Sequence, residues 1–162
     1  MNQEERNQKI EAYGRGYDLL VNALAEVPRE TWEFKSSPTD WSVHEIIIHM
    51  ADSESMAALR VRKLIVEPGS TLMAYEEAKW ADALNYQEQS TDDALQVIRL
   101  ARQMAYRLLK SLPDEVFTHS VMHPEYSEPY TFEKWLNIYS RHIPDHVEQL
   151  MKSYAAWREQ HK

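Results

Sequence analysis

The chain has 162 residues, a net charge of −8, three glycines, seven histidines and no cysteine. This length predicts a single domain over residues 1–162, because two halves would each lack a sufficient core. Few glycines disfavour hairpin-rich folds, the acidic charge disfavours nucleic acid or an anionic membrane as a partner, and the missing cysteines exclude disulfides and thiol nucleophiles.

The amino-terminal part of the chain predicts two helices. Apolar residues recur every three or four positions over about residues 3–26, which is typical of one helix face. Residues 28–41 contain two prolines and several small polar residues, so we expect a loop. The second helix begins at a capping box, in which Ser42 and Glu45 satisfy each other's backbone amides, and it ends at Pro68.

The rest of the chain predicts two more long helices. Residues 71–89 suggest a short helix or an ordered loop, and a third long helix follows over about 90–112. Residues 114–130 are a long loop with room for a short hairpin, and such loops are often functional. The last helix covers about 131–161, and Pro144 should interrupt and kink it. Four amphipathic helices predict an all-α, up-down four-helix bundle.

Three histidines are candidate metal ligands. His142 and His146 occupy apolar-stripe positions of the last helix, and their spacing of four puts both on one face. His49 lies at the edge of the apolar stripe of the second helix. Bundle cores build metal sites from facing helices in this way, and three protein ligands leave positions open for water or substrate. The alternative is a group of partly buried, hydrogen-bonded histidines. The remaining histidines are predicted to be solvated or in loops: His44, His119, His123 and His161.

Several neighbours are candidates for supporting roles. A ligating histidine usually donates its second ring N–H to a carboxylate or carbonyl, and acids near the three histidines are Asp52, Glu45 and Asp145. Each acid is otherwise an ordinary surface residue. A pocket beside the metal would be lined by Trp135, Tyr139 and parts of residues 71–89 and 114–130, although aromatic residues at such positions more often belong to the core. Arg141 is a candidate to hold an acidic group of a ligand, and is otherwise a solvated cation.

Two segments resemble a known family. Residues 41–54, which read WSVHEIIIHMADSE, and residues 141–150, which read RHIPDHVEQL, are similar to the second and last helices of the DinB superfamily, also called DinB-like or YfiT-like. The resemblance implies a four-helix bundle, commonly homodimeric, in which His49, His142 and His146 bind a divalent metal ion, usually nickel or zinc. The family name refers to induction by DNA damage and implies no DNA binding.

The resemblance also suggests an activity. Some members of the family are transferases that use a low-molecular-weight thiol, and many are labelled metal-dependent hydrolases. We therefore expect a metal-dependent thiol S-transferase or hydrolase. With no cysteine in the chain, any thiol would have to be a co-substrate. The alternatives are a non-catalytic, stress-related bundle that binds a metal or small ligand, and an interaction module that acts through its dimer surface. The polar start and the lack of a long apolar run predict a cytoplasmic location without a membrane partner.

Overall fold

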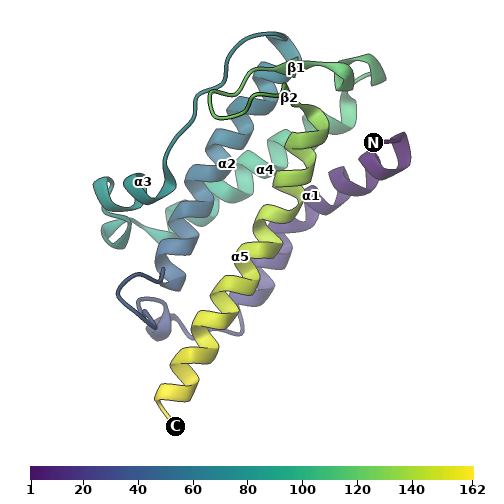
Figure 1. The fold of residues 1–162 in the computed structure, drawn as a ribbon. Coiled ribbons are helices and arrows are strands. Elements are labelled where there is room, and N and C mark those ends of the chain that lie inside the picture. The colour runs from purple at the N-terminus through teal and green to yellow at the C-terminus, as the bar shows by residue number, and fades with distance from the viewer.

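The computed structural model describes residues 1–162 and consists mainly of helices (Figure 1). The long helices are α1 (Gln3–Leu24), α2 (Val43–Val66), α4 (Thr91–Ser111) and α5 (Phe132–Gln160). All four agree with the predicted helices to within a few residues. No helix combines the length and the apolar character that crossing a bilayer requires.

Side-chain caps explain where the long helices begin. The Ser42 hydroxyl accepts from the backbone N–H of Glu45 at 3.2 Å, and the Glu45 carboxylate accepts from the Ser42 N–H at 2.8 Å, which confirms the predicted capping box. Asn2, Ser90 and Thr131 cap α1, α4 and α5 in a similar way. Each cap satisfies a backbone amide that the first helical turn leaves without a partner.

The direction of each helix follows from contacts between the helix ends. The amino group of Met1 forms an ion pair with Glu133 at 2.8 Å, so α1 and α5 begin at the same end of the bundle. Arg29 and Asp92 pair at the other end, beside the start of α4. At this same end, the backbone N–H of His44, in the first turn of α2, donates to the carbonyl of Trp32. Thus α2 and α4 both run opposite to α1 and α5.

The expected four-helix bundle is confirmed, but its chain order differs from simple up-down alternation. Helices α2 and α4 are parallel neighbours, and residues 67–90 return along the bundle to connect them (Figure 1). Helices α1 and α5 are also parallel and pack side by side. In an up-down bundle α2 and α4 would be antiparallel, and a short turn could join them. Here the connection must return along the bundle, and it is long enough to contain the short helix α3.

The connections contain the predicted minor elements. The 67–90 connection includes the short helix α3 (Glu77–Ala83) and a 3₁₀ turn, η2 (Tyr86–Glu88). Another 3₁₀ turn, η1 (Arg29–Thr31), lies in the 28–41 loop. The 114–130 segment contains η3 (Asp114–Thr118) and most of a short antiparallel pair, β1 (Ser120–Val121) with β2 (Tyr130–Thr131), which confirms the hairpin. Helix α5 continues without a break through Pro144, so the predicted interruption is absent.

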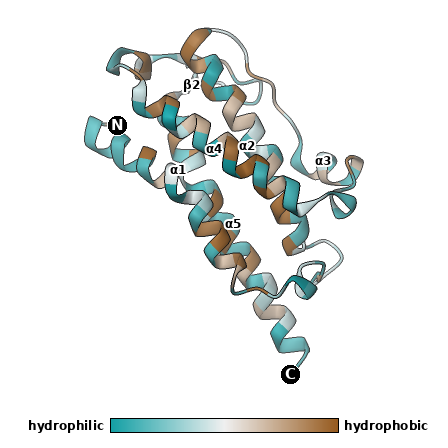
Figure 2. Cartoon of the chain, turned by 180° about the vertical axis from the view of Figure 1, so that it is seen from behind, coloured by the Kyte–Doolittle hydropathy of each residue, from teal (hydrophilic) through white to brown (hydrophobic).

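Two apolar clusters fill the bundle, one near each end. One includes Leu20, Ile46, Ile98 and Leu150, and the other includes Tyr13, Ala57, Ala105 and Trp135. Figure 2 shows that apolar and polar stretches alternate along each long helix. A layer of buried polar side chains separates the two clusters: Glu54 on α2 and Arg102 on α4 lie at this level and pair with each other.

A glycine in α1 provides space for this polar layer. A β-carbon at Gly16 would overlap Nη1 of Arg102, which is held by other hydrogen bonds and cannot retreat. Gly16→Ala is therefore expected to lower the free energy of unfolding by about 1–3 kcal/mol, as overpacking does, despite the better helix propensity of alanine. Denaturant titration monitored by circular dichroism measures the change.

The matched control is Gly14→Ala in the same helix. Its β-carbon would approach the Tyr106 ring to 2.7 Å, but this ring is only partly buried and can turn aside. We expect a smaller loss than at Gly16. Equal stability of Gly16→Ala and the unmodified chain would show that Arg102 moves freely and that the layer is not tightly packed.

Candidate metal centre

The structure brings His49, His142 and His146 together between α2 and α5. One ring nitrogen from each lies within 4.8 Å of the others. The centroid of the His49 ring is 5.4 Å from the centroid of the His142 ring and 4.7 Å from that of the His146 ring. Two nitrogens that share an ion at about 2.1 Å each can be at most about 4.2 Å apart, so binding requires only a small approach of the rings.

The local environment keeps all three rings neutral. Burial, followed by the neighbouring His146, lowers the pKa of His49 to about 3. Burial also lowers the pKa of His142 well below its usual value, with further contributions from the other two histidines and Arg102. The pKa of His146 is lowered by burial as well. A metal ion binds the neutral imidazole, so these rings are in the required protonation state at neutral pH.

An unsatisfied ring nitrogen supports the fit of a metal ion. Nδ1 of His49 is buried and has no hydrogen-bond partner. Such buried polar atoms are rare in folded proteins because desolvation without a partner is unfavourable. His146 differs, because its Nδ1 lies 2.8 Å from Oε1 of Gln149. The Gln149 carbonyl can accept from an Nδ1–H, which leaves Nε2 of His146 as the ligand atom.

A cavity of about 500 Å³ opens beside His146. Its walls come from the loop before α2, from α3 and from α5: Ser36, Thr39, Asp40, Trp41, Glu77, His146, Gln149, Lys152 and Ser153. The Trp41 ring also packs against His49, with a centroid distance of 4.8 Å. His49 is only 1% exposed, whereas His146 is partly exposed. The centre is therefore closed on the α2 side and open toward this polar cavity.

A second group of polar side chains lies on the opposite side of His142. Tyr139 is one turn before it, with a centroid distance of 6.1 Å, and the Tyr139 hydroxyl accepts from Arg60 at 3.0 Å. Burial raises the pKa of Tyr139 to about 12, although Arg60 acts in the opposite direction. Tyr139 therefore packs against His142 and remains a neutral phenol, but it does not line the cavity beside His146 as expected.

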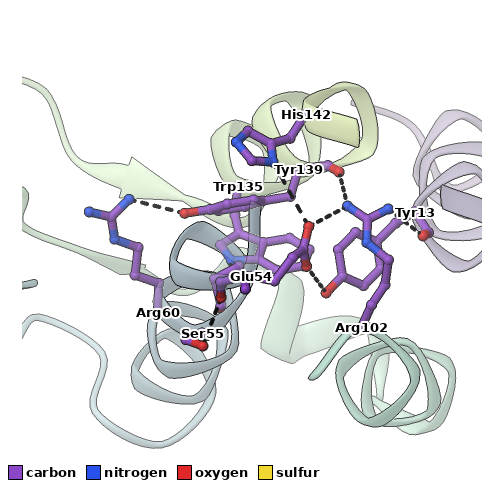
Figure 3. Close-up of polar contacts among 10 residues, drawn as sticks. Tyr13, Glu54, Ser55, Arg60, Arg102, Trp135, Tyr139 and His142 are labelled. Atoms are coloured by element: carbon purple, nitrogen blue, oxygen red, sulfur yellow. Dashed lines mark hydrogen bonds and ion pairs between the residues drawn. The ribbon is translucent and has the colours of Figure 1, made fainter. Parts of the chain in front are cut away.

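The buried carboxylate nearest to a candidate ligand is Glu54. Its Oε1 lies 4.0 Å from Nδ1 of His142, and the same oxygen accepts from Arg102 at 2.6 Å (Figure 3). Sequence reasoning did not select Glu54 or Arg102. Each stands at an apolar-stripe position, Glu54 between Met50 and Ala57, and such a charge within a stripe is the signal that marks them.

The acids expected to support the histidines make other contacts. Asp52 accepts from the Tyr86 hydroxyl at 2.6 Å, and no hydrogen bond joins it to a histidine. Glu45 is occupied as the cap of α2 and also pairs with Lys35 at 3.0 Å. Asp145 is exposed and lies 3.4 Å from Arg141. These three expectations are corrected, because helix geometry directs the carboxylates toward other neighbours.

Two further expected pocket residues lie outside the centre. Arg141 is exposed, with 74% of its side chain accessible, and contacts Asp145 rather than the cavity. Trp135 is fully buried in the core, where its indole N–H donates to the carbonyl of Ala57 at 3.1 Å. The 114–130 segment lies near the end of α2, far along that helix from His49. Of the two segments expected to line the pocket, only residues 71–89 therefore contribute, through Glu77.

The remaining histidines form local contacts. A ring nitrogen of each of three lies near a backbone carbonyl: His44 with Tyr86, His119 with Leu64 and His161 with Trp157. His123 lies in the loop between β1 and β2, as expected, but its ring is 4% exposed and stacks on Tyr126 and Tyr130 instead of being solvated. None of the four lies in the group formed by His49, His142 and His146.

Comparison with known proteins assigns the family. The profile described as "DinB superfamily" matches residues 12–150. A Bacillus subtilis protein named "Putative metal-dependent hydrolase YfiT" is 23% identical over 144 residues, covering 82% of this chain and 81% of its own. A similarly named protein of Oceanobacillus iheyensis, OB0782, is 26% identical over 132 residues, covering 82% of this chain and 76% of its own.

A solved structure has the same fold. The structure described as "YfiT from Bacillus subtilis is a probable metal-dependent hydrolase with an unusual four-helix bundle topology" superposes with a TM-score of 0.86 and 20% identity. The alignment covers 94% of this chain and 87% of that one. Since the profile spans most of the chain and the folds agree, the protein belongs to the DinB superfamily.

Proposed function

We propose that this protein is a metal-dependent hydrolase that holds one divalent ion with His49, His142 and His146. The observation that carries the proposal is the position of three neutral imidazoles around one point, next to an open polar cavity. The names of the relatives from Bacillus subtilis and Oceanobacillus iheyensis support the same class of activity. Three protein ligands leave room for a water molecule and a substrate, as catalytic metal sites do.

Zinc and nickel are the ions that we propose for the site. Imidazole nitrogen suits zinc, nickel, copper and iron, whereas magnesium and calcium prefer oxygen ligands. The three candidate ligands all offer nitrogen, and the nearest buried carboxylate is already paired with Arg102. Metal analysis of protein purified without added chelator identifies the ion.

The side chains of this protein would position the metal ion and enclose one side of its site. A divalent ion in this place would supply acidity, so that a bound water or thiol forms a nucleophile near neutral pH. The α2 side of the site is closed because His49 is buried between α2 and α5 and His142 is only slightly exposed. Trp41 covers His49, and the polar cavity beside His146 gives a substrate access from one direction.

Transfer of a low-molecular-weight thiol is the second candidate function. Because the chain has no cysteine, no protein thiol competes for the ion, and the thiol must enter as a co-substrate. The cavity favours a polar ligand, since Trp41 is its one hydrophobic wall residue. Lys152 in the same wall supplies a cation for an acidic group, which is the role predicted for Arg141.

Parallel assays on zinc- and nickel-loaded protein test both candidates. One set offers chromogenic carboxylic and phosphate esters, and the other offers small thiols with an electrophilic aryl halide. For hydrolysis, we expect a metal-dependent rate with the esters that disappears with a chelator and in His146→Ala. His161→Ala is the matched control, because His161 lies at the exposed carboxyl end.

The two sets separate the candidates. A rate that needs both thiol and metal would replace hydrolysis by thiol transfer as the function. Tight metal binding without a rate in either set would favour the non-catalytic alternative and count against both enzymatic proposals.

A further inference from the structure

A buried polar network joins all four long helices and reaches the candidate metal centre. Arg102 of α4 lies at its middle and donates to the carbonyl of Tyr13 at 2.7 Å, to Oε1 of Glu54 at 2.6 Å and to the carbonyl of Tyr139 at 2.8 Å (Figure 3). The guanidinium also lies over the Tyr13 ring, 4.1 Å from its centroid. These contacts come from α1, α2 and α5, so one side chain connects α4 to the other three.

Both oxygens of Glu54 are held in place by this network. Oε1 accepts from Arg102, and Oε2 accepts from the Tyr13 hydroxyl at 3.1 Å. Glu54 and Arg102 are almost completely buried, with 0% and 1% of their side chains exposed. Burial and the Glu54 charge raise the pKa of Tyr13 well above its usual value, so Tyr13 remains a donor. The carboxylate therefore has a defined orientation before any ligand binds.

The oriented carboxylate of Glu54 faces the ring of His142. Its Nδ1 is buried and has no hydrogen-bond partner, while Oε1 of Glu54 lies 4.0 Å away (Figure 3). A hydrogen bond to a carboxylate is about 2.7–2.9 Å long, so a ring movement of roughly 1 Å would close the gap. The same movement is of the size that the three ligand nitrogens need to approach a shared ion.

We propose that Glu54 is a positioning residue for the metal centre, which accepts a hydrogen bond from Nδ1–H of His142 and thereby directs Nε2 of His142 to the ion. The inference rests on the proposed metal site. A carboxylate behind a ligating imidazole selects the tautomer, restricts ring rotation and makes the ring a stronger ligand. Arg102 keeps the carboxylate aimed at His142, because it holds Oε1 on the side facing α5.

The test compares Glu54→Gln with Tyr13→Phe. The first keeps the side-chain shape but removes the charge behind His142, whereas the second removes only the donor to Oε2. Zinc affinity is measured by competition with a chromogenic chelator, and the cobalt-substituted protein is examined by its visible d–d spectrum. We expect Glu54→Gln to bind zinc about 10- to 100-fold more weakly with an altered cobalt spectrum. Tyr13→Phe should bind within a few-fold of the unmodified chain with an unchanged spectrum.

Each outcome distinguishes between the two proposals. If the unmodified chain binds no divalent ion, the proposed function itself fails. If it binds zinc and Glu54→Gln binds equally well with the same cobalt spectrum, the metal site stands and the role of Glu54 is overturned.

A measurement on the unmodified chain avoids the risk that Glu54→Gln does not fold. In the zinc-loaded protein, ¹⁵N-resolved NMR of the imidazoles should show His142 with a protonated Nδ1 and a ligating Nε2. Ligation through Nδ1 would overturn the inference, because that nitrogen could then donate nothing to Glu54.

Discussion

His142→Ala is expected to abolish tight binding of zinc or nickel, and His49→Ala and His146→Ala should do the same. Each substitution removes one of three nitrogens that lie within 4.8 Å of one another, and the two that remain hold the ion much more weakly. The loss should exceed the roughly 10- to 100-fold that follows removal of an outer hydrogen-bond partner. Isothermal titration calorimetry on metal-free protein measures it.

Metal binding should also raise the stability of the folded chain. At a free metal concentration of about 100 times Kd, binding adds about 2.7 kcal/mol, which corresponds to a rise in Tm of roughly 5–11 °C for a domain of this size. We expect this rise in the unmodified chain and in His161→Ala, and its absence in His142→Ala. A rise that persists in all three ligand variants would place the ion elsewhere and refute the histidine site.

Arg102→Met is expected to be the most destabilising single substitution in the polar layer. It leaves the Glu54 carboxylate buried without its partner and also removes donors from the carbonyls of Tyr13 and Tyr139. Breaking a buried ion pair from one side costs about 3–5 kcal/mol, which lowers Tm by roughly 6–20 °C here. Calorimetry or thermal denaturation followed by circular dichroism checks the value.

Two controls separate the buried charge from general effects of the substitution. Arg29→Met removes an exposed ion pair with Asp92 and should change stability far less than Arg102→Met, because water screens an exposed pair. Adding Glu54→Gln to Arg102→Met removes the unpaired charge, so part of the lost stability should return. No recovery in the double variant would mean that packing, and not charge, accounts for the loss.

The helices could be predicted because their determinants are local. Ser42 and Glu45 cap α2 through contacts three residues apart, and both residues are visible in the sequence. Apolar residues repeat with the helical period in all four long segments. Pro144 was misleading, since it marks a break in isolated helices, whereas α5 here is held by packing along its length and continues.

The candidate site was predictable only in part. His142 and His146 share a face by spacing alone, and His49 was joined to them by its position on the second helix and by the family resemblance. The structure places the three side by side. The partners of these rings were not predictable from proximity along the chain. Asp52 is closer in sequence to His49 than Glu54 is, yet Asp52 bonds to Tyr86, while Glu54 faces His142 on another helix.

The helices, their caps, the family resemblance and the nitrogen character of any metal site follow from residue types and short spacings along the chain. Three features were visible only in the folded molecule: α2 and α4 run parallel, the 36–41 loop lines the cavity, and Glu54 and Arg102 meet beside His142. Those features depend on how helices far apart in the chain are arranged around one another, and the periodicity of each helix shows which face is buried without showing what it meets.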